Sequence, residues 1–184
     1  MKQFVGKKLV ITAMLLALAV VLSLPGATEF FHMPFGGGVT IASLVPIVII
    51  SLMYGSSYGV GIAMLFGAIQ LYLGFNNASA LTKNFQTYAI FILLDYIVAF
   101  GVIGLVELFR RSFRNYYVGV VVATVIVCIL RLACHTASGI LIWRSKSLYA
   151  SLAYNATYMV PETLITCVVL ALLLKPIRKI SQGN

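Results

Sequence analysis

Charged residues are scarce in this chain, and acidic residues are the scarcest of all. Only 9% of the 184 residues are charged, against about 25% in an ordinary soluble domain. Hydrophobic residues make up 61% of the chain, and the mean hydropathy is +1.04. A soluble fold of this size cannot bury so much apolar surface, so the composition predicts a membrane protein of one domain, residues 1–184.

Several functional classes lack their usual residue patterns here. The three cysteines have no paired spacing, which argues against a disulfide framework or a cysteine metal site. No Gly-Lys-Ser/Thr follows the glycines at 36–38, so ATP hydrolysis by a phosphate-binding loop is not expected. His32 and His135 are far apart and lack a zinc-protease pattern, so no metal is expected. The lysines and arginines that give the net charge of +9 lie mostly beside apolar segments, as the residues that flank membrane spans do. This distribution argues against a nucleic-acid partner.

Six apolar segments are candidate membrane spans, since about 20 apolar residues cross the hydrocarbon core. Backbone groups in lipid must form hydrogen bonds within their own segment, so every span is expected to be a helix. The sequence therefore predicts an all-α integral membrane protein, a bundle of six transmembrane helices with Pro46 interrupting the second. The expected spans are residues 9–24, 39–54, 59–73, 87–109, 116–143 and 150–174.

Lysine and arginine predict the orientation of these spans. Six spans place both termini on one side, and most of the cations flank that side, so we expect both termini to be cytoplasmic. The cations on that side are Lys2, Lys7, Lys8, Arg110, Arg111, Arg114, Lys175, Arg178 and Lys179, against Lys83, Arg144 and Lys146 opposite. In the first span, Ala13 and Ala17 form a pair of small residues that allows close contact with another helix.

Polar residues inside the fifth span predict one wall of a polar pocket. Four residues turn a helix by about 400°, so side chains at this spacing share one face. A titratable group at membrane depth normally faces a partner, a cavity or a ligand. His135 is expected to bind a ligand, relay a proton or bond a hydroxyl, and Trp143 to stack on a ring or anchor at the interface. The residues at this spacing are Arg131, His135, Gly139 and Trp143.

Carboxylates and an amide in two other spans add to this pocket. Asp95, a carboxylate in the middle of the fourth span, is interpreted either as the counter-ion of a cationic substrate or as an ion-pair partner of Arg131. In the last span Asn155 offers a donor and an acceptor to a heterocycle edge. Glu162, seven residues further on, is expected to be a structural partner. Tyr149 either closes the pocket mouth or is an interfacial aromatic residue.

Four segments together resemble the thiamine-specific substrate-binding subunits, or S-components, of energy-coupling factor transporters. They are Gly36-Gly-Gly-Val-Thr-Ile-Ala-Ser-Leu-Val-Pro-Ile47, Leu93-Leu-Asp-Tyr-Ile-Val-Ala-Phe100, His135-Thr-Ala-Ser-Gly-Ile-Leu-Ile-Trp143 and Tyr154-Asn-Ala-Thr-Tyr-Met-Val-Pro-Glu162. The resemblance implies a protein of the prokaryotic cell membrane that captures thiamine near the outer face without changing it, beneath the loop between the first two spans. It implies no cofactor, with ATP used only by two partner ATPase subunits on a transmembrane coupling subunit.

The resemblance also implies residue roles. Asp95 would supply the acidic contact to thiamine with Tyr96 beside it, His135 and Trp143 would line and stack on the rings, and Asn155 would bond a ring edge. Ala13 and Ala17 would dock on the coupling subunit.

The chain departs from the pattern of such subunits in two places. Family members tend to carry a pocket tyrosine where this chain has Ala150, with Tyr149 one residue away, and some carry a tryptophan near Gly37. These departures leave the identity of the vitamin open, and three alternatives remain. One is a subunit for another heterocyclic vitamin or a thiamine precursor. The second is an intramembrane enzyme that uses His135 and Asp95, and the third is a structural assembly subunit.

Overall fold

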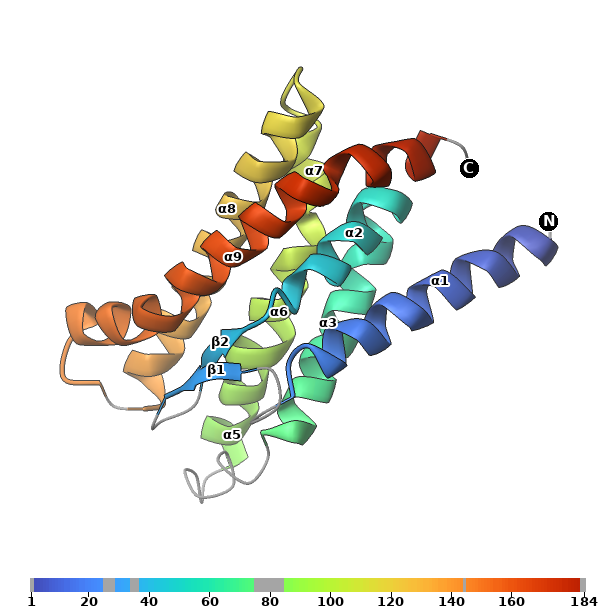
Figure 1. Ribbon diagram of the computed structural model, residues 1–184. Helices are drawn as coiled ribbons and strands as arrows, with labels where there is room; N and C mark the ends of the chain where they lie inside the picture. Colours follow the sequence, from blue (N-terminus) through green and yellow to red (C-terminus); the bar gives the residue numbers. More distant parts are fainter. Residues whose placement is uncertain (1, 25–28, 34–36, 75–84, 144, 183–184) are drawn as a thin grey trace.

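The computed structural model describes residues 2–24, 29–33, 37–74, 85–143 and 145–182, which form helices and one short hairpin. A run of shorter helices, including the π-helical η1 and the 3₁₀-helical η2, makes one continuous helical segment over residues 85–110. The elements are α1 (Lys2–Val21), β1 (Glu29–His32), β2 (Gly38–Thr40), α2 (Leu44–Tyr54), α3 (Ser56–Leu73), α5 (Phe85–Phe91), η1 (Ile92–Val98), α6 (Ala99–Gly101), η2 (Val102–Leu105), α7 (Val106–Arg110), α8 (Tyr116–Leu141) and α9 (Leu148–Gln182). Figure 1 shows their arrangement.

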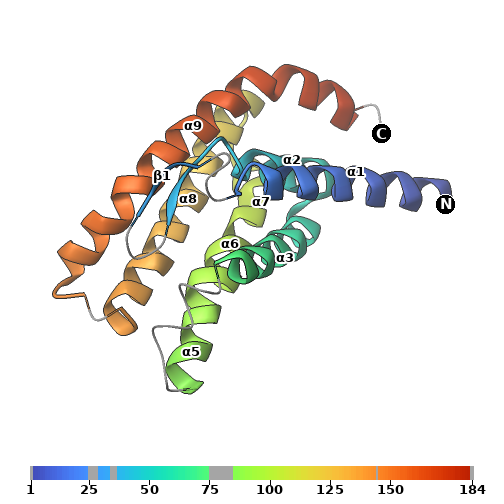
Figure 2. The same ribbon diagram turned by 60° about the horizontal axis from the view of Figure 1, so that its bottom comes forward.

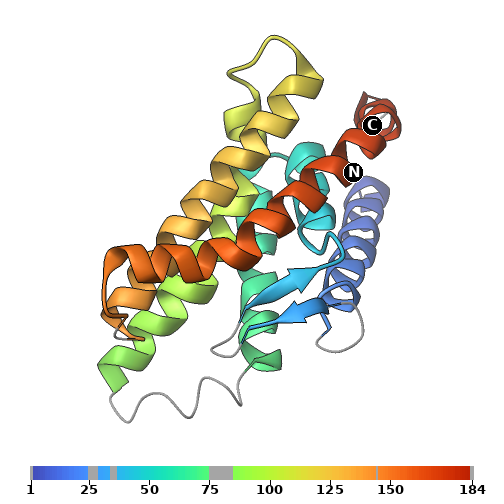
Figure 3. The ribbon, with the colours of Figure 1, turned by 60° about the vertical axis from the view of Figure 1, so that its left-hand side comes forward.

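The predicted all-α membrane architecture is confirmed, and four helical segments are long and apolar enough to cross a membrane. These four are α3, residues 85–110, α8 and residues 148–176 of α9. α8 and α9 lie side by side (Figure 2). The first turn of α1 and the last turns of α9 lie at the same end of the bundle (Figure 3). Lys7, Lys8 and Arg110 belong to this end, so the charge distribution continues to predict that it faces the cytoplasm.

The expected second span is wrong in its first part, because helix α2 begins only at Leu44. Residues 38–40 form a strand instead, and Ala42 has a φ of 57°, which a right-handed helix does not allow. Pro46 does not interrupt the helix: it lies in the first turn, where its missing N–H has no helical partner. With 11 residues, α2 is about 16 Å long, about half of the hydrocarbon thickness.

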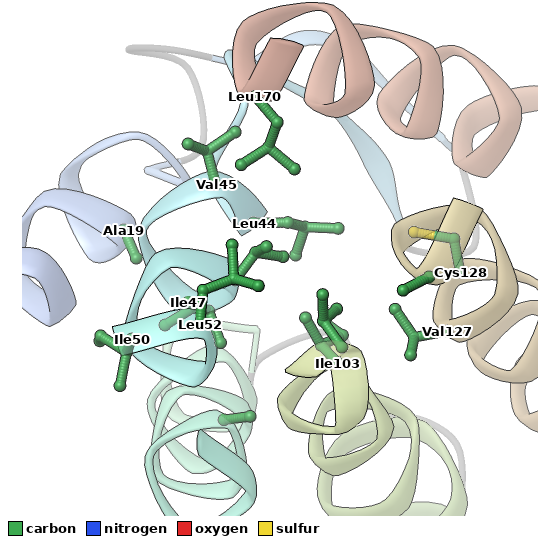
Figure 4. Close-up of a cluster of buried hydrophobic side chains, with 14 of the residues drawn as sticks. Ala19, Leu44, Val45, Ile47, Ile50, Leu52, Ile103, Val127, Cys128 and Leu170 are labelled. Carbon is green, nitrogen blue, oxygen red and sulfur yellow. The ribbon is translucent and has the colours of Figure 1, made fainter. Parts of the chain in front are cut away.

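Helix α2 can be this short because it is the centre of the core. Its side chains Leu44, Ile47, Val48 and Ile50 are each at most 1% exposed, and they pack against the neighbouring helices rather than lipid (Figure 4). Hydropathy alone cannot separate a helix buried in protein from one that crosses lipid. The bundle therefore surrounds one apolar internal helix that leads directly out of the hairpin.

The antiparallel hairpin of β1 and β2 was not predicted. Its strands pair Phe31 with Val39 and His32 with Gly38, so their backbone groups are bonded within the protein. Gly37 turns the chain with a φ of +87°, which glycine adopts without steric cost. A Cβ on Gly37 would also lie 2.6 Å from Cζ of Tyr158 on α9. A side chain as large as tryptophan therefore does not fit at Gly37 in this arrangement.

Candidate functional site

Asp95 lies in the π-helical segment η1 and is only 7% exposed. A π-helical turn is wider than an α-helical turn, is rare, and is frequent at functional sites. It shifts the register of the following residues, so the carboxylate points to a face that α-helical spacing does not predict. Asp95 is thereby directed at the facing side of α8.

Three polar groups surround the Asp95 carboxylate. His135 Nδ1 lies 2.9 Å from Oδ1, Ser138 donates to Oδ2 at 2.5 Å, and Trp143 Nε1 donates to Oδ2 at 3.4 Å. The structure thus brings together Asp95, His135 and Trp143, which the sequence had placed in one pocket. Ser138 was missed. The sequence does indicate its position, because Ser138 lies three residues after His135 and therefore on the same helical face.

His135 also has an unused polar atom. Its Nε2 is buried and has no hydrogen-bond partner among the residues that the structure describes. A neutral imidazole that donates from Nδ1 to Asp95 carries a lone pair on Nε2. Leaving a buried polar atom unpaired costs about 1–3 kcal/mol, so this atom indicates a place for a ligand donor. The hydroxyl of Thr136 is unpaired in the same way within the described part of the chain.

Helix α9 forms the other side of the site at Asn155. The Asn155 amide donates to the Ser151 carbonyl at 2.9 Å and accepts from the Tyr158 hydroxyl at 2.7 Å. The Ser151 hydroxyl in turn donates to the carbonyl of Thr136 on α8 at 2.9 Å. Gly139 permits this close approach of the two helices, since a Cβ there would lie 2.0 Å from Ser151 Oγ and 3.8 Å from Asn155 Nδ2. Asn155 therefore lies next to the helical face that carries His135.

Aromatic rings line the side of the cluster next to Trp143. Phe91 contacts Trp143 edge-on, with ring centroids 6.2 Å apart. Phe91 also contacts Tyr96 edge-on, with ring centroids 5.3 Å apart. Tyr96 also stacks on Phe100 at 6.4 Å. Tyr96 thus supports the aromatic wall through Phe91, a residue that the sequence analysis did not select. Edge-to-face and offset contacts of this kind are the favoured aromatic geometries.

Two predicted site residues lie elsewhere or have another partner. Tyr149 is 80% exposed at the start of α9, so the structure does not bring it into the cluster, and the interfacial interpretation fits its position better. The suggested Asp95–Arg131 ion pair is wrong. Arg131 bonds Glu162 instead, with Nη1 3.0 Å from Oε2, because η1 turns Asp95 toward His135. Glu162 is thus the structural partner that was expected.

The arrangement suits binding more than bond-making. A buried carboxylate attracts a cation, the rings offer a stacking surface, and Asn155 and His135 Nε2 offer directional bonds. No group of three His, Cys, Asp or Glu side chains that could hold a metal occurs among the described residues. Fold and site together define a multi-pass helical membrane protein with a polar site between its helices, at the end opposite the chain termini (Figure 1).

Comparison with known proteins identifies the family. A profile of the thiamine transporter protein family matches residues 9–182, and this chain belongs to that family. The thiamine transporter ThiT of Bacillus subtilis is 36% identical in an alignment that covers 90% of this chain and 89% of that protein. A solved structure of ThiT from Listeria monocytogenes superposes with a TM-score of 0.68 at 18% identity, covering 95% of this chain and 98% of the other. That likeness shows a shared fold.

Proposed function

We propose that this chain is the substrate-capture subunit for thiamine uptake in the membrane of a prokaryotic cell. Its family membership and its helical membrane fold support this function. The observation that carries it is the buried Asp95 carboxylate beside an aromatic wall, because thiamine contains a permanently cationic ring. The chain releases thiamine unchanged and needs no cofactor of its own.

The site residues divide the recognition of thiamine between them. Asp95 faces the cationic thiazolium, and its charge is strengthened where water is excluded. Trp143 offers a ring face for stacking, and Phe91 and Tyr96 hold that ring in place. His135 Nε2 accepts a hydrogen bond from an amine or hydroxyl of the ligand, and Asn155 bonds a ring edge with its remaining N–H.

Uptake is energised by partner proteins, a transmembrane coupling subunit with two ATPases. Ala13 and Ala17 are exposed on α1, next to Met14 at 68% and Leu18 at 48% exposure. Small residues on an exposed apolar face allow the backbone of another helix to approach closely. This face of α1 is the proposed docking surface for the coupling subunit.

An intramembrane enzyme is the alternative from another class, since Asp95 and His135 are in contact. In a serine hydrolase the histidine lies between the nucleophile and the acid. Here Asp95 lies between His135 and Ser138, so His135 does not take the serine proton. Capture of another heterocyclic vitamin or of a thiamine precursor by the same site is the alternative within the class.

Thiamine titration of the purified protein tests the proposal, followed by the fluorescence of Trp143, which is the only tryptophan. We expect saturable quenching that Asp95→Asn weakens strongly. Glu107→Gln is the matched control, because Glu107 is equally buried at 7% exposure but bonds Arg110 and Arg111 near the other end of the same helical segment. Quenching by another vitamin alone would redirect the proposal to that ligand. Quenching by no vitamin would contradict it.

A further inference from the structure

A second buried charge cluster lies outside the Asp95 site. Arg131 and Glu162 form an ion pair whose side chains are 9% and 4% exposed. Replacing such a pair by apolar residues is often neutral or stabilising, so stability alone does not explain two charges at membrane depth.

Glu162 connects the pair to the hairpin. Its Oε2 accepts from Arg131, and its Oε1 accepts from the hydroxyl of Thr40 at 2.8 Å. Thr40 is the last residue of β2, and its Oγ1 also lies 2.7 Å from the Ser43 hydroxyl that precedes α2. We call Thr40, Arg131 and Glu162 the hairpin anchor. It joins β2, α8 and α9 through one carboxylate.

The backbone next to the anchor is strained. Ala42, between Thr40 and α2, has a φ of 57°, a left-handed conformation in which the Cβ of a non-glycine residue crowds the following carbonyl oxygen. Such a conformation persists only when its surroundings hold it. The bond of Thr40 to Glu162 is a contact that holds it, so loss of this bond favours release of the hairpin from α9.

The hairpin in turn supports the ligand site. Met33 and Val39 pack against Tyr158 and Met159 of α9, and Gly37 lies against the Tyr158 ring. The Tyr158 hydroxyl bonds Asn155, which the proposed function assigns to a ring edge of the ligand. Displacing the hairpin therefore removes the packing that keeps Tyr158, and with it Asn155, in place.

We propose that Glu162, held by Arg131, is a positioning residue that anchors the β1–β2 hairpin to α9 through Thr40 and thereby slows release of the ligand. This inference rests on the proposed function for the identity of the ligand, but the anchoring itself does not. The anchor differs from the binding cluster in that none of its residues is required to touch the ligand.

The test compares Thr40→Val, which keeps the side-chain shape and removes the hydroxyl, with Thr124→Val. Thr124 is also buried, but its hydroxyl bonds the Val120 carbonyl of its own helix at 2.8 Å. Stopped-flow Trp143 fluorescence should show thiamine dissociating about tenfold faster from Thr40→Val, the effect of losing a hydrogen bond to a charged group. The association rate should change less than about twofold. Thr124→Val should release thiamine as the unmodified protein does.

A double-mutant cycle identifies the acceptor. Arg131→Met combined with Glu162→Met removes both charges and should release thiamine as fast as Thr40→Val. Adding Thr40→Val to that background should then have a much smaller effect than in the unmodified protein, because the bond to Glu162 is already lost and only the bonds between Thr40 Oγ1 and Ser43 remain to be broken. Additive effects, or a Thr40→Val release rate equal to that of the unmodified protein, would overturn the anchor while leaving thiamine binding intact.

Hydrogen exchange of the ligand-free protein separates this inference from the proposed function. The Met33 amide, which donates to the Gly37 carbonyl at 2.8 Å, should exchange faster in Thr40→Val than in Thr124→Val. If the Met33 amide exchanges faster in Thr40→Val but thiamine does not quench the fluorescence of Trp143, the result would support the anchor and contradict the proposed ligand. Equal exchange in both variants would refute the anchor whatever the ligand.

Discussion

The close contact of α8 and α9 at Gly139 can be tested by adding a single methyl group. In Gly139→Ala the new Cβ would lie 2.0 Å from Ser151 Oγ and 3.1 Å from Ser151 Cβ. Overpacking of this kind costs about 1–3 kcal/mol, and displacing Ser151 from the Thr136 carbonyl costs about 1 kcal/mol more. Alanine regains about 1 kcal/mol of helix propensity over glycine. The expected net loss is about 1–3 kcal/mol of unfolding free energy.

Thermal unfolding in detergent measures this loss, and Gly61→Ala is the control. Gly61 lies inside α3, and a Cβ there meets nothing within 4 Å, so this variant should melt at or above the temperature of the unmodified protein. Ser151→Gly added to Gly139→Ala removes the overlapping atoms and should recover much of the loss. Thiamine affinity should fall in Gly139→Ala as well, because Asn155 lies beside the contact. A Gly139→Ala protein as stable as Gly61→Ala would refute the close packing of α8 on α9.

Three further outcomes follow from the structure. Arg131→Met alone should lower the unfolding free energy by about 3–5 kcal/mol by leaving Glu162 unpaired, whereas the double change to methionine should recover most of it in the same melting assay. Tyr149→Ala should leave the thiamine Kd unchanged, since this side chain is 80% exposed; a higher Kd would show that Tyr149 contacts the ligand. Ala13→Leu with Ala17→Leu should leave binding intact but abolish uptake in cells that make the partner subunits, and normal uptake would exclude docking at these positions.

The cluster of Asp95, His135 and Trp143 could be predicted because polar residues are few in an apolar chain. Asp95, His135 and Trp143 stand out against their surroundings, and helical spacing places the last two on one face. Ser138 does not stand out in the same way, because serine is common in membrane helices and its role depends on the facing carboxylate. The partner of Arg131 could not be chosen from the sequence either. That choice depends on the π-helical turn of η1, which leaves no mark in the hydrophobic pattern.

The rest of the fold depends on contacts between distant segments. The hairpin is held by Tyr158 and Glu162, more than a hundred residues further along the chain. Helix α2 has the apolar composition of a membrane span, and only the burial of eight of its 11 residues against other helices shows that it is an internal helix. Local patterns report burial of a side chain, but not whether lipid or protein surrounds it.

Recognition of a positive charge by Asp95 is the central claim, and a neutral isostere of thiamine tests it most directly. The isostere replaces the cationic thiazolium by an uncharged thiophene ring of the same shape. Opposite charges about 4 Å apart at a partly shielded site interact by about 4 kcal/mol. The Kd of the unmodified protein for thiamine should therefore be more than about tenfold lower than its Kd for the isostere. Asp95→Asn should bind both ligands with similar Kd values. An equal preference for thiamine in the unmodified protein and in Asp95→Asn would contradict the account.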